Sequence, residues 1–134
     1  MIKINHVALN VHNLEYMKNF YCNLFDLTAN NLYENIKKNI KCYFLSSNDG
    51  FSRLELIENN NINEDIHTYN NNEHLGFAHI SFSIGSKENI ELKVHELINK
   101  YKEVKIIDGP RVTGDGSFFA SFTDPEGNLV ELTI

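Results

Sequence analysis

Apolar and polar residues alternate in two stretches of the chain that resemble each other. Residues 4–15 read INHVALNVHNLE and residues 77–91 read FAHISFSIGSKENIE. Alternation with period two is typical of a strand with one buried face. The third residue of each stretch is a histidine, His6 in the first and His79 in the second. The two stretches therefore predict an internal repeat.

A helix is predicted directly after each of these strands, because apolar residues then recur at three- and four-residue spacing. The first helix is expected at about Leu14–Leu27, with Asn13 as its N-cap, and the second at about Lys87–Tyr101. Two aromatic-rich strands follow each helix. They read CYFLSS and SRLELIE in the first half, and SFFASFTD and GNLVELTI in the second. The chain is therefore predicted to be a duplicated βαβββ unit of the α+β class.

The length of 134 residues fits a single domain. We expect two modules, at about 1–58 and 76–134, joined by a polar, Asn-rich linker or flap at about 59–75. The segment Asp124–Asn128 sets Pro and then Gly where a tight turn needs them, so it is expected to join the last two strands as a hairpin.

Four side chains of the repeat are candidates for chemistry. Counting along the strands places His6 and Glu55 on the face that turns away from the first helix, and His79 and Glu131 on the equivalent face of the second module. Charged groups gathered there need compensation, and one divalent cation per site supplies it. Two imidazoles and two carboxylates suit Ni, Co, Zn, Mn or Fe(II) and leave positions for water or substrate.

The other histidines do not repeat, and surface positions are expected for all of them: His12, His67, His74 and His95. Cys22 and Cys42 show no zinc or disulfide spacing and are interpreted as reduced core thiols.

Composition excludes several classes of protein. The formal net charge is -6, and no run of basic residues occurs, so nucleic acid is not an expected partner. No apolar stretch approaches the roughly 20 residues that span a bilayer, which argues against a membrane partner. The first residues lack the apolar region of a signal peptide, and a cytoplasmic protein is expected.

The duplicated unit with its two histidines and two glutamates resembles the vicinal oxygen chelate superfamily, which includes glyoxalases, bleomycin-binding proteins and dioxygenases. The stretches that carry the resemblance are 5–9, 54–56, 76–80 and 124–132. The set of four ligands is most similar to that of bacterial glyoxalase I. That resemblance implies a metal-dependent lyase or isomerase that acts on a hemithioacetal of methylglyoxal through an enediolate stabilised by the metal.

The resemblance also implies roles for individual residues. His6, Glu55, His79 and Glu131 would be metal ligands, Glu131 the catalytic base, and Glu55 a ligand with an accessory acid–base role. Asn10 and Asn59 stand at positions that contact glutathione in related enzymes, which have Arg at the first position and Asn at the second, so only Asn59 matches that pattern. A small-molecule substrate, such as a thiol adduct, and a homodimer are expected, with the metal site within one chain or shared between two.

Two other functions remain open at this point. A methylmalonyl-CoA epimerase-like isomerase shares the proton abstraction, although that family usually has Gln in place of Glu55. An antibiotic-binding resistance protein of the same fold would line a cleft with aromatic rings, whereas core packing is expected for all four candidates: Tyr43, Phe44, Phe118 and Phe122. Arg53 or Arg111 would provide a cation for a substrate carboxylate, and Arg111 is expected in a solvated loop beside Pro110.

Overall fold

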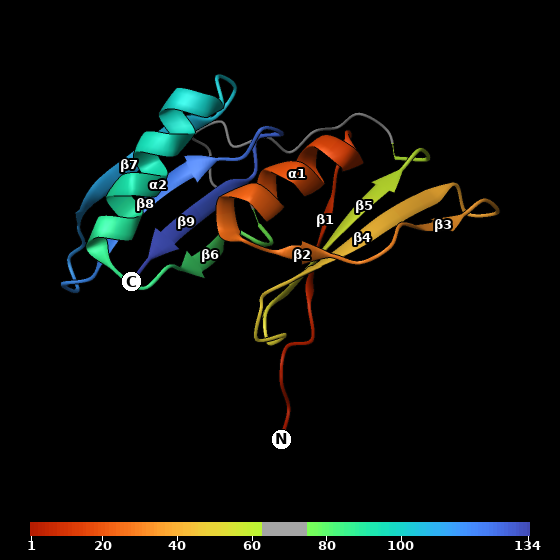
Figure 1. Cartoon of the computed structure of the whole chain (residues 1–134), viewed down its shortest axis with the longest axis horizontal. Coiled ribbons are helices and arrows are strands. Elements are labelled where there is room, and N and C mark those ends of the chain that lie inside the picture. Colours follow the sequence, from red (N-terminus) through yellow and green to blue (C-terminus); the bar gives the residue numbers. More distant parts are fainter. Residues whose placement is uncertain (63–74) are drawn as a thin grey trace. The chain divides into compact units, whose positions relative to one another are not determined.

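The chain divides into two compact units, Met1–Glu64 and Asp65–Ile134 (Figure 1). The computed structural model describes residues 1–62 and 75–134. Each unit has one helix and one mixed sheet, so the fold is α+β and consists of two repeated modules, as predicted. The predicted linker lies mostly outside the described residues, and so do His67 and His74.

The first unit contains one helix and five strands. Its elements are β1 (Val7–Asn10), α1 (Leu14–Phe25), β2 (Thr28–Ala29), β3 (Tyr33–Asn35), β4 (Ile40–Ser46) and β5 (Arg53–Asn59). The strand order is β1-β5-β4-β2, and β3 also pairs with β4. β1 is parallel to β5, whereas the other pairs are antiparallel.

The second unit repeats this topology. Its elements are β6 (Ile80–Ser83), α2 (Lys87–Lys100), β7 (Lys105–Val112), β8 (Phe118–Thr123) and β9 (Leu129–Thr133). The strand order is β6-β9-β8-β7, with β6 parallel to β9. The second strand of the repeat, which follows the helix, is continuous in this unit as β7, whereas β2 and β3 share its role in the first unit because both pair with β4.

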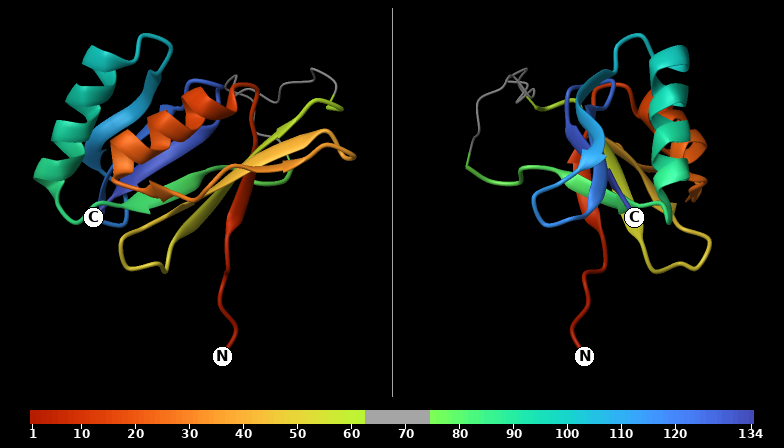
Figure 2. Two further views of the ribbon diagram at one scale, coloured as in Figure 1. Left: turned by 45° about the vertical axis from the view of Figure 1, so that its right-hand side comes forward. Right: turned by 90° about the vertical axis from the view of Figure 1, so that its left-hand side faces the viewer.

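In each unit the core lies between the helix and one face of the sheet (Figure 2). The buried residues of α1 follow helical spacing: Leu14, Met17, Phe20, Tyr21 and Leu24. Leu54 and Leu56 of β5 are buried as well, and Val130 and Leu132 have the same positions in β9. The opposite face of each sheet, which its helix does not cover, is called the helix-free face below.

Both helices end slightly earlier than predicted. Asn13 caps α1 by accepting a hydrogen bond from the backbone N–H of Tyr16, as expected. The helix ends at Phe25 because Asp26 adopts a left-handed conformation with φ of 53°. In α2, Tyr101 is already extended, so Lys100 is the last helical residue.

Asp124 organises the predicted hairpin between β8 and β9. One of its carboxylate oxygens accepts the backbone N–H groups of Glu126 and Asn128, each at 2.9 Å, and the other accepts the Asn128 amide at 2.8 Å. The side chain is only 1% exposed, so these donors stabilise a buried acid. The prediction of a tight turn here is confirmed.

The prediction of a loop around Arg111 is wrong. Residues Lys105–Val112 form β7, an edge strand in which Arg111 lies opposite Phe119 of β8. Proline is tolerated there because an edge strand has backbone groups outside the ladder. The pairing shifts register between Asp108 and Arg111, at Gly109–Pro110. Gly109 has a φ of +78°, and a β-carbon there would lie 2.5 Å from the carbonyl oxygen of Phe119, so only glycine fits.

The histidines outside the repeat agree with expectation where they are described, whereas the expectation of two core thiols is met only in part. Cys42 is buried, Cys22 is half-buried, and both are free thiols. His12 and His95 are exposed. Neither helix is long and apolar enough to cross a membrane, within the residues that the structure describes.

Candidate functional site

The first unit brings His6 and Glu55 together. His6 directly precedes β1, and Glu55 is the third residue of β5. The parallel register pairs Ala8 with Glu55, so both candidates lie on the helix-free face. The Nε2 atom of His6 is 3.4 Å from Oε2 of Glu55, and their side chains are 36% and 18% exposed.

Neighbouring side chains orient the His6 ring. Nδ1 of His6 lies 2.7 Å from Oδ1 of Asn5, which is an acceptor, so Nδ1–H donates this hydrogen bond. The lone pair of the neutral ring is then on Nε2, the atom nearest to Glu55. The ring also contacts Phe44 edge to face, with 5.2 Å between the ring centroids. His6 is therefore held so that Nε2 faces the carboxylate.

The second unit repeats this pair at the same strand positions. His79 directly precedes β6, Glu131 is the third residue of β9, and the parallel register pairs Ser81 with Glu131. The Nε2 atom of His79 is 3.2 Å from Oε2 of Glu131. The residue that faces Glu131 from β8 is Ser121, so hydroxyl-bearing residues flank this carboxylate in both neighbouring strands.

Each pair fits half of a divalent metal site. Bonds of about 2.1 Å place adjacent ligand atoms of an octahedral ion about 3 Å apart, close to the separations in both pairs. Imidazole nitrogen and carboxylate oxygen are ligands for borderline divalent ions. No group of three or more potential ligands gathers within the parts of the chain that are described, residues 1–62 and 75–134. The donors therefore come as one pair per unit.

The residues expected to bind substrate lie on β1 and β5. Asn10 is exposed and pairs with Ile57, on the same face as Glu55. Asn59 ends β5, and its Oδ1 accepts the backbone N–H of Asn61 at 3.0 Å. Part of the Asn59 amide is thus used in the turn that follows the strand.

Two further residues lie on the helix-free face beside Glu55: Cys42, which was expected only as a core thiol, and Arg53, which was a candidate cation for a substrate carboxylate. Cys42 of β4 lies near Glu55, and burial together with the negative charge of Glu55 raises the pKa of its thiol. Arg53 of β5 lies over the ring of Phe44, with 4.5 Å between the guanidinium carbon and the ring centroid. The alternation in RLELIE predicts that Arg53 and Glu55 share one face, since they are two residues apart.

The four aromatic candidates divide between the two faces. Tyr43 and Phe122 are buried in the core as expected. Phe118 is half-buried and lies under Lys87 of α2. Phe44 differs from the expectation of core packing, because it pairs with Glu55 and contacts His6 on the helix-free face.

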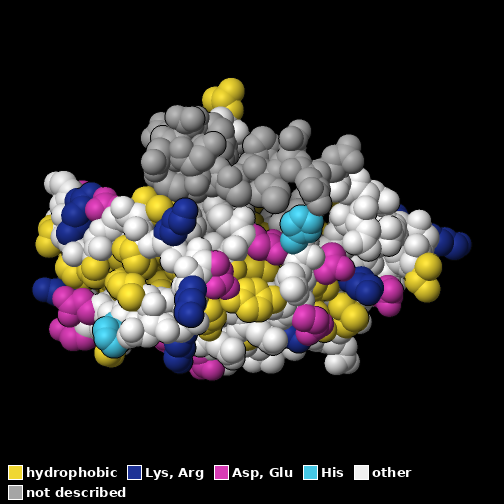
Figure 3. Space-filling model, turned by 90° about the horizontal axis from the view of Figure 1, so that it is seen from above, with side chains coloured by type: hydrophobic (Ala, Val, Ile, Leu, Met, Phe, Trp, Pro, Cys, Tyr) yellow, Lys and Arg dark blue, Asp and Glu magenta, His cyan; other side chains and the backbone are white. Residues whose placement is uncertain are grey.

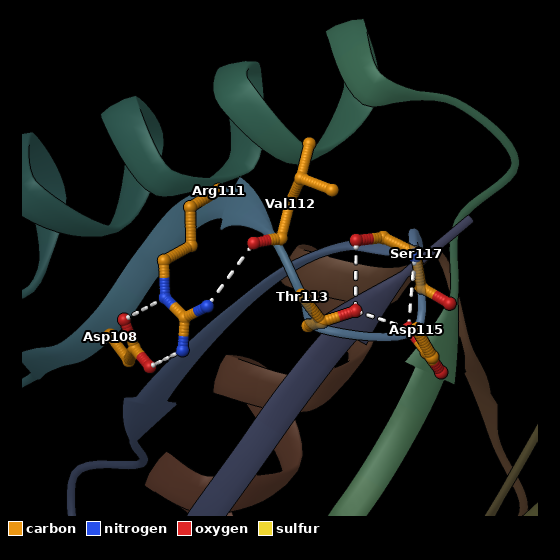
Figure 4. A network of polar contacts seen from close by, with 6 residues as sticks. All are labelled: Asp108, Arg111, Val112, Thr113, Asp115 and Ser117. Atoms are coloured by element: carbon orange, nitrogen blue, oxygen red, sulfur yellow. Dashed lines mark hydrogen bonds and ion pairs between the residues drawn. The ribbon is translucent and has the colours of Figure 1, made fainter.

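Arg111 forms an ion pair with Asp108, a carboxylate of its own strand. Its Nε and Nη2 atoms donate to the two oxygens of Asp108 at 2.7 and 2.6 Å, and Nη1 donates to the carbonyl of Val112 (Figure 4). These bonds hold the pKa of Asp108 below its usual value.

On the face drawn in Figure 3, basic and acidic side chains are interspersed, consistent with the absence of a basic run in the sequence.

The duplicated α+β fold is that of the vicinal oxygen chelate class. A family model described as Glyoxalase/Bleomycin resistance protein/Dioxygenase superfamily matches residues 3–132, and the chain belongs to this superfamily. The superfamily contains many enzymes, including glyoxalase I, and its members commonly bind a divalent metal and often form dimers. The resemblance seen in the sequence is thereby confirmed at the level of family and fold.

Solved structures agree with this assignment. A glyoxalase family protein from Enterococcus faecalis is 25% identical, with a TM-score of 0.76 over 98% of this chain and 97% of that one. The trypanothione-dependent glyoxalase I of Leishmania major is 18% identical, with a TM-score of 0.73 over 99% and 86%. A fosfomycin resistance protein from Listeria monocytogenes is 22% identical, with a TM-score of 0.67 over 99% and 90%. No curated protein matches the sequence.

Proposed function

We propose that the protein is a divalent-metal-dependent lyase or isomerase of the glyoxalase type, acting on a hemithioacetal of methylglyoxal or a related small carbonyl compound. One observation carries this proposal. The two modules place a His–Glu pair at the same strand positions, with Nε2–Oε2 separations of 3.4 and 3.2 Å. A single structural ion pair would not need to recur in both copies of the repeat.

His6, Glu55, His79 and Glu131 are the residues that would hold the ion, which would be Ni, Co, Zn, Mn or Fe(II). A bound ion would act as a Lewis acid toward the vicinal oxygens of the substrate. Asn5 orients the ring of His6 so that Nε2 is available to bind the ion. Asn10 and Asn59 would contact the substrate from β1 and from the end of β5.

Glu131 would move the proton. Its carboxylate would remove the proton on the carbon next to the carbonyl and deliver it to the neighbouring carbon. Ser81 and Ser121 pair with Glu131 in the flanking strands, and their hydroxyl groups can accept or donate hydrogen bonds as its charge changes. Glu55 faces Ala8 and Phe44 instead, which suits a ligand with only an accessory acid–base role.

The two modules, at about 1–58 and 76–134, would together form one functional domain, and the protein would act as a homodimer. The ion would be held by two His–Glu pairs, which would come either from one chain or from two chains of the dimer. Sedimentation of the metal-loaded protein separates these arrangements, since a monomer of 15.5 kDa that binds metal and turns over would exclude a site shared between chains.

The test is turnover of methylglyoxal by the metal-loaded protein with a panel of low-molecular-weight thiols. Isomerisation that disappears with chelator and returns with one of the five metals supports the proposal. Metal binding without turnover of any hemithioacetal, but with epimerisation of an acyl thioester, would favour the epimerase. A stoichiometric complex with an antibiotic that forms equally well without metal would favour a binding protein.

A further inference from the structure

The chain has only two arginines, and both lie over a phenylalanine ring of the neighbouring strand. The guanidinium carbon is 4.5 Å from the ring centroid of Phe44 for Arg53, and 5.0 Å from that of Phe119 for Arg111. A ring beneath the guanidinium restricts the side chain and contributes cation–π attraction. The two arginines thus share this type of ring contact, although Arg53 lies in β5 and Arg111 in β7, which are not equivalent strands of the repeat.

Their polar partners differ. Arg111 donates to both oxygens of Asp108, so its charge is already compensated. Arg53 donates from Nη1 to the amide oxygen of Asn5 at 3.4 Å, a weak bond to a neutral group. It forms no ion pair with any carboxylate within residues 1–62 and 75–134.

Arg53 is linked to the candidate metal ligands through two side chains. Oδ1 of Asn5 accepts hydrogen bonds from Nη1 of Arg53 and, at 2.7 Å, from Nδ1 of His6. The Phe44 ring contacts both the Arg53 guanidinium and the His6 ring. Arg53 also precedes Glu55 by two residues in β5, so the two side chains share the helix-free face. The arginine is therefore held beside the His6–Glu55 pair.

We propose that Arg53 is the anion-recognition residue of this face and binds a carboxylate or phosphate group of the small-molecule ligand. The guanidinium fork can donate two parallel hydrogen bonds to such a group. Because Phe44 and Asn5 already restrict the side chain, less conformational entropy is lost when an anion binds. Arg53 would thus select ligands that carry a negative charge a short distance from the group at His6 and Glu55. Its part in substrate choice rests on the proposed function, but the binding of an anion does not.

Anion binding can be measured without any turnover. The side-chain Nε–H groups of two arginines give two signals in a ¹⁵N NMR spectrum, which Arg53→Lys and Arg111→Lys assign. Acetate and inorganic phosphate are titrated separately into the full-length protein, with chloride at matched ionic strength as control. We expect the Arg53 signal to shift in a saturable manner with acetate, with phosphate or with both, which also identifies the preferred anion. Absence of a shift, or equal shifts of both arginines, would overturn the proposal.

Selection among substrates is measured by kinetics. The readout is the ratio of kcat/KM for the hemithioacetal of an anionic thiol, glutathione, to that for a neutral thiol, 2-mercaptoethanol. Arg53→Gln is expected to lower this ratio roughly tenfold, mainly through KM, because a charge-assisted bond is lost. Arg111→Gln, the matched control, should leave it unchanged. An equal loss with both thiols in Arg53→Gln would indicate a structural role and contradict the proposal. A wild-type protein that turns over neither thiol but shows the saturable NMR shift would reject the glyoxalase function and retain the anion site.

Discussion

The Nε2 atom of His79 lies 3.2 Å from Oε2 of Glu131, and this relationship repeats the one between His6 and Glu55 in the first unit. In both units the histidine directly precedes the first strand, and the glutamate is the third residue of the last strand. The parallel register fixes the result, because each glutamate pairs with the residue two positions after the histidine. The geometry therefore follows from the topology of the repeat.

Replacing the proposed base tests the division of roles within the four ligands. Glu131→Gln keeps the size of the side chain and an oxygen that can bind metal, but it removes the basic carboxylate. Turnover is expected to fall by a factor of about 10² to 10⁴, while the circular dichroism spectrum and most of the metal content are retained. Glu91→Gln makes the same change on the exposed surface of α2 and should leave turnover unaffected. A Glu131→Gln protein with wild-type kcat would reject Glu131 as the base.

Packing beneath the candidate site is tested at Leu56. Its side chain is 0% exposed and lies one residue after Glu55, on the face toward α1. Leu56→Ala is expected to lower the free energy of unfolding by about 2–5 kcal/mol, since it removes buried methyl groups and leaves a cavity. Ile36→Ala is the control, because Ile36 is 85% exposed and should change stability by less than about 0.5 kcal/mol. Urea unfolding measures both, and equal effects would contradict the described core.

Acid sensitivity is expected from the turn between β7 and β8. Asp115 accepts hydrogen bonds from the Thr113 hydroxyl and the Ser117 backbone N–H, which lower its pKa from 3.8 to about 2 (Figure 4). Because the pKa is lower in the folded state, the carboxylate stabilises the fold above about pH 4, and this contribution disappears as the pH falls to about 2.

Asp115→Asn measures that contribution. The stability difference between wild type and Asp115→Asn should be constant from pH 7 to about 4 and should shrink between about pH 4 and 2. Added salt should reduce it, since the group is fully exposed. Thermal unfolding across this pH range provides the data. A difference that does not change with pH would show that the hydrogen bonds do not depend on the charge of Asp115.

Several features of the fold could be predicted because short-range patterns determine them. Alternation identified the faces of β5 and β9, and Leu54 and Leu56 are buried while Glu55 is not. Asn13 marked the start of α1 correctly, because an N-cap needs only a local side-chain acceptor. The repeat itself gave the α+β class. These are properties of neighbouring residues and can be recognised without knowing the tertiary contacts.

Other features depend on contacts that the sequence does not reveal. The end of α1 is set by the left-handed conformation of Asp26, a residue type that gives no strong stop signal. β7 was not predicted around Arg111 because it contains Pro110, a residue that is tolerated in a strand only at the edge of a sheet. Phe44 lies on the helix-free face because β4 pairs it with Glu55, a register that is not encoded in its hydrophobicity. The position of Arg53 over Phe44 depends on that same register.

Metal content tests the central claim most directly. Untagged protein is reconstituted with Ni, Co, Zn, Mn or Fe(II), desalted, and analysed by mass spectrometry for metal and protein, beside a Glu55→Ala/Glu131→Ala double variant. We predict one divalent ion per chain in the wild type and its loss in the double variant, in which one carboxylate is removed from each His–Glu pair. Absence of a specific metal after reconstitution, or equal retention of metal by the double variant, would contradict the proposal that the two pairs together hold a catalytic ion.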